Sequence, residues 1–120
     1  MSASFRDLRV WQQAMDLTLD VCRDTATFPK HELYGLTQQM RRAAVSVPSN
    51  IAEGKGHRTD GDFRRFLFHA RGSLMELETQ ISIAGRLEYL TVERSRILQS
   101  TATQVGRSLT GLLNSLAAAA

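Results

Sequence analysis

The sequence predicts an all-α protein: an antiparallel up-down-up-down four-helix bundle whose second helix is kinked at Pro48. Apolar residues recur every three or four positions in four long segments, whereas no segment alternates with the period of two typical of strands. The connections between these segments are short, so successive helices are expected to be antiparallel neighbours. A chain of 120 residues has the usual length of one domain, and we expect a single domain over residues 1–120.

The first helix is expected over residues 7–26. An apolar stripe steps by three and four residues along it, and a second apolar row runs beside this stripe. The stripe consists of Leu8, Trp11, Met15, Thr18, Cys22 and Thr25, and the second row consists of Val10, Ala14, Leu17 and Val21. The only cysteine of the chain therefore belongs to the stripe and is expected in the core. Pro29 then turns the chain, because proline suits a helix start better than a helix interior.

The second helix is expected over residues 31–54. Its stripe consists of Leu33, Leu36, Met40, Ala43 and Val47. Pro48 interrupts this helix, because proline has no amide hydrogen for the carbonyl of Ala44 and its ring crowds that carbonyl. Either the helix breaks near Val47, or one helix continues through a kink and a serine hydroxyl or a water meets the freed carbonyl. We favour the kink, since the apolar spacing continues through the proline to Asn50.

Glycine marks the end of the second helix and also lies inside the later ones. The sequence Gly54-Lys55-Gly56 is expected to end the second helix, because glycine accepts the left-handed conformation of a helix end. Glycine inside a helix costs about 1 kcal/mol relative to alanine. Close approach of helices, inside the bundle or between subunits, would explain four such residues. They are Gly72, Gly85, Gly106 and Gly111.

The third and fourth helices are expected over residues 60–87 and 91–117. Thr59 and Thr91 precede them as caps, whose hydroxyls accept hydrogen bonds from free amides of the first turn. Apolar residues then follow at heptad spacing in both helices. The third helix carries Phe63, Leu67, Ala70, Leu74, Leu77, Ile81 and Ala84, and the fourth carries Leu98, Ala102, Val105, Leu109, Leu112 and Leu116.

Basic residues are concentrated in the middle of the chain. The net charge is +3, and thirteen of the fifteen basic residues are arginine. Residues 41–71 hold seven basic and three acidic side chains, a net charge of +4, whereas the remainder has a net charge of −1. Arginine makes planar, bidentate contacts with phosphate, so we predict a nucleic-acid-binding surface, with a solvated, salt-bridged helix face as the alternative. Its residues are Arg41, Arg42, Lys55, Arg58, Arg64, Arg65 and Arg71.

Polar residues follow the proline where the apolar spacing predicts core positions. A buried Asn50 must be hydrogen-bonded, and a buried Glu53 needs a cationic or hydrogen-bonding partner. We interpret them as part of a structural polar network that ties the second helix to the third near Glu76, with subunit contact and ligand binding as alternatives. The network is expected to contain Ser46, Pro48, Asn50, Glu53, Glu76 and Glu78.

No sequence motif points to an enzyme. No glutamate is followed three residues later by histidine, as in metal-binding four-helix bundles, and the three histidines share no ligand spacing. Lys55 lies between glycines, but a phosphate-binding loop also needs glycine at position 49 and serine or threonine at position 56, where this chain has Ser49 and Gly56. We therefore expect no catalytic residue, no cofactor and no metal. We also expect no membrane span, and the single cysteine fits a cytoplasmic protein.

Three stretches of the chain resemble a bacterial family of four-helix bundles, first noted as proteins encoded in intervening sequences of 23S ribosomal RNA genes. They are FRDLRVWQQA, FPKHELYGLTQQMRRAAVSVPSNIAEGKGHR and RRFLFHARGSLMELETQISIA. The resemblance covers about residues 5–116, and the segment from Pro29 to Gly56 is its most specific part. The same family includes the accessory variability proteins of diversity-generating retroelements.

The resemblance implies an antiparallel four-helix bundle that assembles into a ring-like homopentamer with a central channel. By likeness to the retroelement relative, it implies a basic surface that binds RNA or DNA and a partner reverse transcriptase. No catalytic role attaches to the residues of the family motif. Carried over by position, these are Arg42, Ser46, Pro48, Asn50, Glu53 and Gly54 in the second helix and Gly72, Ser73, Glu76 and Glu78 in the third.

Two functions are therefore expected as alternatives. The first is a homo-oligomeric, non-enzymatic accessory protein that binds nucleic acid or a partner that processes it. The second is a protein–protein scaffold whose arginines make salt bridges between subunits, and apolar residues outside the stripes support such an interface. These are Tyr34, Phe66, Phe68 and Leu113. Against the first function, no aromatic side chain is expected to interleave with the arginines as a stacking platform, since Phe63, Phe66 and Phe68 are assigned to the core or an interface.

Overall fold

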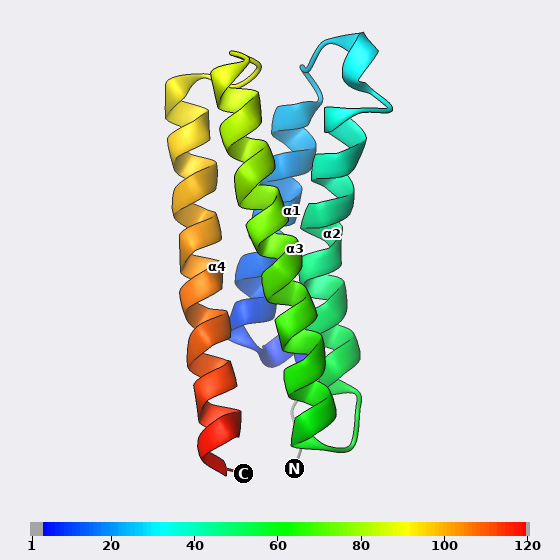
Figure 1. Ribbon diagram of the computed structural model, residues 1–120, viewed down its shortest axis with the longest axis vertical. Coiled ribbons are helices and arrows are strands. Elements are labelled where there is room, and N and C mark those ends of the chain that lie inside the picture. The colour runs from blue at the N-terminus through cyan, green and yellow to red at the C-terminus, as the bar shows by residue number, and fades with distance from the viewer. Residues whose placement is uncertain (1–3, 120) are drawn as a thin grey trace.

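The computed structural model describes residues 4–119, in which four long helices run alternately up and down (Figure 1). They are α1 (Arg9–Thr25), α2 (Leu36–Lys55), α3 (Asp60–Arg86) and α4 (Val92–Ala119), with short 3-10 helices η1 (Phe5–Asp7) and η2 (Lys30–Glu32) before α1 and α2. Each helix packs against the next, and α4 closes the bundle against α1. The bundle measures 46 × 23 × 20 Å. The predicted antiparallel four-helix bundle is confirmed, and no strand occurs in residues 4–119.

The core contains one face of each helix. All seven stripe residues of α3 are buried, as predicted, and so are the first four of α4. Farther along α4, Leu113 is buried whereas Leu112 is only partly buried. The expectation that Leu113 lies outside the core is therefore wrong. A straight helix has 3.6 residues per turn, so its inward face drifts away from a strict seven-residue spacing.

In α1 the second row faces the centre of the core, and the stripe lies beside it. Val10, Ala14, Leu17 and Val21 are all buried. Among the stripe residues, the two threonines are buried, whereas Cys22 is only half-buried. The prediction that the cysteine is a core residue is therefore wrong, because its side chain lies at the edge of the apolar face.

The second helix begins five residues later than predicted, at Leu36. Residues 30–35 form η2 and a turn, and Leu33 is exposed instead of lying in the core. A carboxylate oxygen of Glu32 accepts a hydrogen bond from the amide of Leu36 at 3.2 Å, which satisfies a free donor of the first turn. A 3-10 turn repeats every three residues, so the apolar spacing could not distinguish it from a helix.

The second helix continues without a break through Pro48, which excludes the broken-helix alternative. The carbonyl of Ala44, to which Pro48 cannot donate, accepts a hydrogen bond from the hydroxyl of Thr18 in α1 at 3.0 Å. The same hydroxyl lies 2.8 Å from the carbonyl of Ala14 in its own helix. A threonine of a neighbouring helix thus fills the role that we expected of a serine or a water. The kink itself stays a prediction.

Beyond Pro48 the buried face of α2 passes through Ile51 and Gly54, while Asn50 is half-buried. A Cβ at Gly54 would lie 2.7 Å from the Cβ of Phe66 and 3.0 Å from Cδ1 of Phe63, so glycine lets α2 and α3 approach closely. Gly56, with φ of −75°, is right-handed, and no glycine among residues 4–119 has a positive φ. The predicted left-handed glycine end of α2 is therefore wrong.

The glycines inside α3 and α4 have different surroundings. A Cβ at Gly85 would lie 2.6 Å from the Ser95 hydroxyl oxygen, which is the predicted close approach inside the bundle. A Cβ at Gly106 would make only an ordinary contact, 3.5 Å from Leu74. Open space surrounds Gly72 and Gly111. Packing inside the bundle therefore does not explain these two, and contact between subunits stays a prediction for them.

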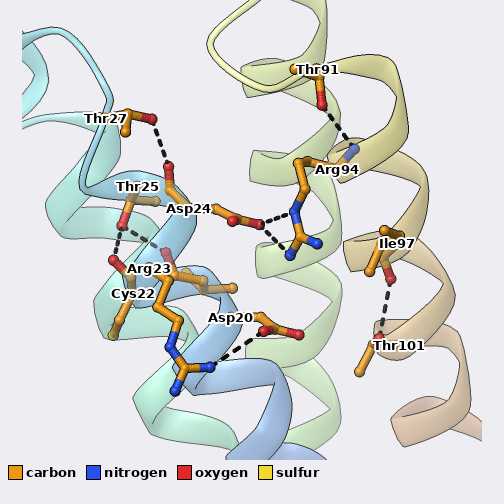
Figure 2. Close-up of polar contacts among 11 residues, drawn as sticks. Asp20, Cys22, Arg23, Asp24, Thr25, Thr27, Thr91, Arg94, Ile97 and Thr101 are labelled. Carbon is orange, nitrogen blue, oxygen red and sulfur yellow. Dashed lines mark hydrogen bonds and ion pairs between the residues drawn. The ribbon is translucent and has the colours of Figure 1, made fainter.

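Both predicted threonine caps are present. The Thr59 hydroxyl accepts a hydrogen bond from the amide of Asp62 at 3.1 Å, and the Thr91 hydroxyl accepts one from the amide of Arg94 at 3.0 Å. Arg94 also joins α4 to α1, because its Nε and one terminal nitrogen donate to a single oxygen of Asp24 at 3.0 and 2.8 Å (Figure 2). Its hydrogen bond to Asp24 raises the pKa of Arg94 above its ordinary value. None of the helices in residues 4–119 is long and apolar enough to cross a membrane.

Candidate nucleic-acid interface

The seven predicted basic residues occupy two separate places. Five of them surround the α2–α3 connection and the first turns of α3, and we call them the α2–α3 cluster. The cluster consists of Lys55, Arg58, Arg64, Arg65 and Arg71. Arg41 and Arg42 instead lie near the start of α2, about 20 Å along the helix axis from Lys55 at 1.5 Å per residue. Arg71, two residues before Ser73 of the Ser46–Ser73 hydrogen bond, lies at a height between these two groups.

Arg41 contributes to the packing of α2 against α1. Its Nε donates to the hydroxyl of Thr25 at 2.9 Å, and a terminal nitrogen donates to the carbonyl of Cys22 at 3.3 Å. Both acceptors lie in the last turn of α1, where the helix dipole favours a cation. Arg42, in contrast, is exposed and borders a shallow depression with Val45.

Aromatic rings lie between the arginines of the α2–α3 cluster. Residues three and four apart share a face of a helix, so Phe68 meets both Arg64 and Arg71. The guanidinium carbons of these arginines lie 5.5 and 5.2 Å from the centre of the Phe68 ring. Phe68 is 44% exposed. The expectation that no aromatic side chain interleaves with the arginines is therefore wrong.

A second stack surrounds Phe66, which is half-buried on the α2 side of α3. The guanidinium carbon of Arg65 lies 4.6 Å from the centre of this ring. The ring of His57 stacks on Phe66 with a centroid distance of 4.8 Å and an interplanar angle of 30°. The ring of His69 lies 6.1 Å away. Three of these four side chains come from the first turns of α3, and His57 comes from the loop before it.

Sequence reasoning missed the two histidines and the exposed rings as members of the site. The signal lay in the stretch RRFLFHAR, residues 64–71, where basic and aromatic residues recur at helical spacing. The third ring of this region, Phe63, is buried as predicted. The ammonium group of Lys55 lies 5.9 Å from its centre.

One acidic side chain offsets part of the charge of the α2–α3 cluster. The carboxylate of Asp62 lies 3.7 Å from a terminal nitrogen of Arg65 and 3.8 Å from Nδ1 of His57. Within residues 4–119, no ion pair joins Arg58, Arg64 or Arg71 to a carboxylate. Arg58 and Arg71 are exposed, whereas Arg64 is half-buried and its Nε is buried without a hydrogen-bond partner.

An open groove of about 540 Å³ lies between α3 and α4, beyond Phe68. Its floor is apolar, because Leu74 and Ala102 are buried and Gly106 has no side chain. Its exposed rims carry Arg71 and Met75 from α3 and Arg107 from α4. One arginine of the α2–α3 cluster thus also borders this groove.

The predicted polar network is smaller than expected and has a different partner on α3. The side-chain amide of Asn50 donates to the carbonyl and the hydroxyl oxygen of Ser46 at 2.8 and 3.0 Å. The Ser46 hydroxyl lies 2.8 Å from the hydroxyl of Ser73, which connects α2 to α3. Pro48 is buried but lies two residues from both Ser46 and Asn50, which places it on the opposite side of α2. The tie between the helices is therefore a serine pair that Asn50 supports.

The three glutamates assigned to this network lie outside it. Glu53 is exposed. Glu76 is exposed and accepts a hydrogen bond from Gln80 of its own helix at 3.4 Å. Glu78 contributes only its backbone carbonyl, which accepts from Gln99 of α4 at 3.0 Å. The hypothesis that Asn50 and Glu53 connect α2 to α3 near Glu76 is therefore wrong. The hydrogen bond that connects the two helices here joins Ser46 to Ser73.

The histidines do not form a metal centre in the described part of the chain. His57 and His69 flank Phe66, whereas His31 lies in the α1–α2 connection. Across residues 4–119, no group of three histidine, cysteine, aspartate or glutamate side chains comes close enough to hold a metal ion.

Comparisons with known proteins agree with this architecture. The family model described as 23S rRNA-intervening sequence protein matches residues 6–111. The fold is similar to the 1.70 Å crystal structure of a protein with unknown function from the S23 ribosomal protein family of Bacteroides thetaiotaomicron. The two have a TM-score of 0.81 and 19% identity, over 87% of this chain and 97% of that chain. Among proteins with curated descriptions, none matches this chain.

Proposed function

The chain belongs to the 23S rRNA-intervening sequence protein family, and we propose that it is a non-enzymatic accessory protein that binds nucleic acid. In this proposal it is a cytoplasmic homo-oligomer, with a pentamer as the assembly that the family resemblance implies. A nucleic-acid-processing protein such as a reverse transcriptase is its proposed protein partner. Repetition of one site around an oligomer would multiply contacts that are individually weak.

The α2–α3 cluster is the observation that carries the proposal. Four of its five cations lie over phenylalanine rings, at 4.6 to 5.9 Å from the ring centres. A side chain restrained in this way loses less conformational entropy when it meets a phosphate. Contacts with phosphate position a protein on nucleic acid without reading its sequence. The proposed binding is therefore electrostatic and independent of sequence.

Titration of labelled structured RNA and duplex DNA at several salt concentrations, followed by fluorescence anisotropy, tests this proposal. We expect binding in about the micromolar range or tighter, and a logarithmic salt slope of several units. The double variant Arg64→Ala/Arg65→Ala removes two phosphate contacts, so the slope is expected to fall by about two units. The matched control Arg86→Ala/Arg96→Ala removes the same charge near the α3–α4 connection and should keep the wild-type slope.

Two results would contradict the proposal. The first is the absence of binding to either nucleic acid at low salt. The second is an equal change of slope in both double variants, because binding would then depend on the net charge of the protein and not on the α2–α3 cluster.

A protein–protein scaffold is the second candidate, and the outer face of α3 supports it. Met75 is 61% exposed and Ile83 is 44% exposed, and the open surface at Gly72 lies one turn before Met75. Apolar side chains on one helix face are typical of a contact surface. A scaffold would form its oligomer, measured by native mass spectrometry, without binding any polyanion in the titrations above.

A further inference from the structure

We infer that the surface around Phe68 binds unpaired bases, so that the preferred ligand of this protein is a single-stranded nucleic acid. This inference rests on the proposed function and adds the class of ligand. It depends on three features of α3 and its neighbours: the two arginines over Phe68, the stack around Phe66, and the groove between α3 and α4.

The first feature is the pair of arginines over Phe68. Their guanidinium carbons lie 5.5 and 5.2 Å from the ring centre, and neither arginine has an ion-pair partner within residues 4–119. Both arginines therefore lie over the ring and not beside a carboxylate, and the Nε of Arg64 is also buried. A guanidinium group is flat and weakly hydrated, so its free face can stack on a base while its N–H groups meet phosphate. Along its length, a duplex offers only the phosphate contact, because its bases are stacked and paired inside it.

The second feature is the stack around Phe66, which lies on another side of the same helix. Phe66 and Phe68 are two residues apart, which separates them by about 200° around the helix axis. The ring of His57 and the guanidinium of Arg65 extend the aromatic surface of Phe66 toward the α2–α3 loop. Stackable groups thus flank the first turns of α3 on two sides. A flexible single strand can follow such a surface, whereas a stiff duplex cannot.

The third feature is the groove of about 540 Å³ beyond Phe68. Its volume lies in the usual range for small-ligand sites, about 300–1,000 Å³, and its floor is apolar. Arg71 lies over Phe68 and also lines this groove, as does Arg107 of α4. A base that leaves the Phe68 stack therefore finds an apolar floor whose borders carry two cations and one carboxylate, that of Glu78. Bases paired inside a duplex are not available for this contact.

The arrangement combines the two contributions on which sequence-independent single-strand binding depends. Cations along a path attract the phosphates, and flat groups beside the path stack on bases of any sequence. Removing one stacking side chain typically weakens binding about tenfold. Because the stacking contribution carries no charge, it should be separable from the salt dependence of binding.

The experiment compares three labelled probes by anisotropy: oligothymidylate and oligouridylate of about 12 nucleotides, and a hairpin duplex with the same number of phosphates. The two single strands distinguish DNA from RNA as the natural source of the same chemistry. Phe68→Leu removes the ring but keeps an apolar side chain of similar size. Tyr34→Leu is the matched control, because Tyr34 is an 85% exposed ring in the α1–α2 connection, at the other end of the bundle.

Wild-type protein is expected to bind at least one single strand more tightly than the hairpin. Phe68→Leu should weaken single-strand binding about tenfold and leave the salt slope unchanged. The hairpin affinity should fall by less, because the hairpin loses only the restraint of Arg64 and Arg71 and no stacked base. Tyr34→Leu should leave all three affinities unchanged. Arg71→Lys keeps the charge but loses the flat group, so it should weaken single-strand binding more than hairpin binding.

Three outcomes would overturn the inference while the proposed function survives. They are an equal loss of hairpin and single-strand binding in Phe68→Leu, unchanged single-strand binding in both site variants, and a change in oligomeric mass in Phe68→Leu, which would place this ring in a subunit contact. Absence of binding to all three probes at low salt would instead contradict the proposed function itself.

Discussion

The hydroxyl of Thr18 replaces the backbone amide that Pro48 lacks, because it donates a hydrogen bond to the carbonyl of Ala44. Thr18→Val keeps the shape of the side chain but leaves the buried carbonyl of Ala44 without a donor. We expect a loss of about 1–3 kcal/mol in the free energy of unfolding. In a Pro48→Ala background a backbone amide is restored to that carbonyl, so the same substitution should cost less. Urea unfolding of the four proteins of this double-mutant cycle measures the coupling.

The matched control is Thr79→Val. Thr79 is exposed and donates only to the carbonyl of Met75 in its own helix, at 3.0 Å. Its substitution should change stability by less than about 0.5 kcal/mol. If Thr18→Val costs the same in both backgrounds, the hydroxyl is not a substitute for the missing proline amide.

The sequence allowed the roles of single residues to be predicted where the signal was local. It did not allow contacts between residues far apart in the chain to be predicted. Thr59 and Thr91 could be predicted as caps because each meets an amide three residues ahead. Thr18 could not be paired with Ala44, because the two are 26 residues apart and only the packing of α1 on α2 brings them together. The same limit explains why Ser73, and not Glu53 or Glu76, emerged as the link between α2 and α3.

The packing of α2 on α3 depends on the missing side chain at Gly54. The Cβ of an alanine there would lie 2.7 Å from the Cβ of Phe66 and 3.3 Å from the carbonyl oxygen of Phe63. Neither atom is the free end of a flexible side chain, so the helices must move apart. Gly54→Ala is expected to destabilise the protein by about 1–3 kcal/mol, although alanine favours the helix itself. The midpoint and slope of urea unfolding measure this change.

Gly72→Ala provides the control for this prediction. Gly72 lies in the interior of α3 with open space around it, so alanine should stabilise a single subunit by up to about 1 kcal/mol. A neutral or stabilising effect of Gly54→Ala would contradict the close approach of the two helices.

At the scale of whole helices, the apolar periodicity predicted the number and the order of the four helices correctly. It also predicted the core face of α3 correctly, since all seven of its stripe residues are buried. It was less accurate for α2. Leu33 falls in a turn that keeps a spacing of three, and the inward face passes to Ile51 where we expected Asn50. Spacing alone does not distinguish a turn from a helix, nor 3.6 residues per turn from 3.5.

At the scale of the molecule, the α1–α2 and α3–α4 connections lie at one end of the bundle and the α2–α3 connection at the other (Figure 1). The end with the α1–α2 and α3–α4 connections is held by contacts between distant segments, namely Arg94 with Asp24 and Tyr89 with Glu32. The end with the α2–α3 connection carries the cations of the α2–α3 cluster and the exposed ring of Phe68. The uneven charge was readable from the sequence, but the pairing of each arginine with a ring required the helix geometry.

Acid should weaken the first of these ends, because the carboxylate of Glu32 accepts hydrogen bonds from the Leu36 amide at 3.2 Å and from the Tyr89 hydroxyl at 2.9 Å. The bond from Leu36, followed by that from Tyr89, lowers the pKa of Glu32 below its ordinary value of 4.5. This stabilisation is fully present above pH 4.5 and is lost as the pH falls through the lowered value. Urea unfolding at a series of pH values should therefore show Glu32→Gln less stable than wild type at neutral pH, with the difference shrinking progressively below pH 4.5. Tyr89→Phe removes one of the two hydrogen bonds, so its loss of stability relative to wild type should be smaller and of the same sign. If the stabilities of Glu32→Gln and wild type instead differ by a constant amount from neutral to acid pH, the Glu32 carboxylate does not stabilise this end of the bundle.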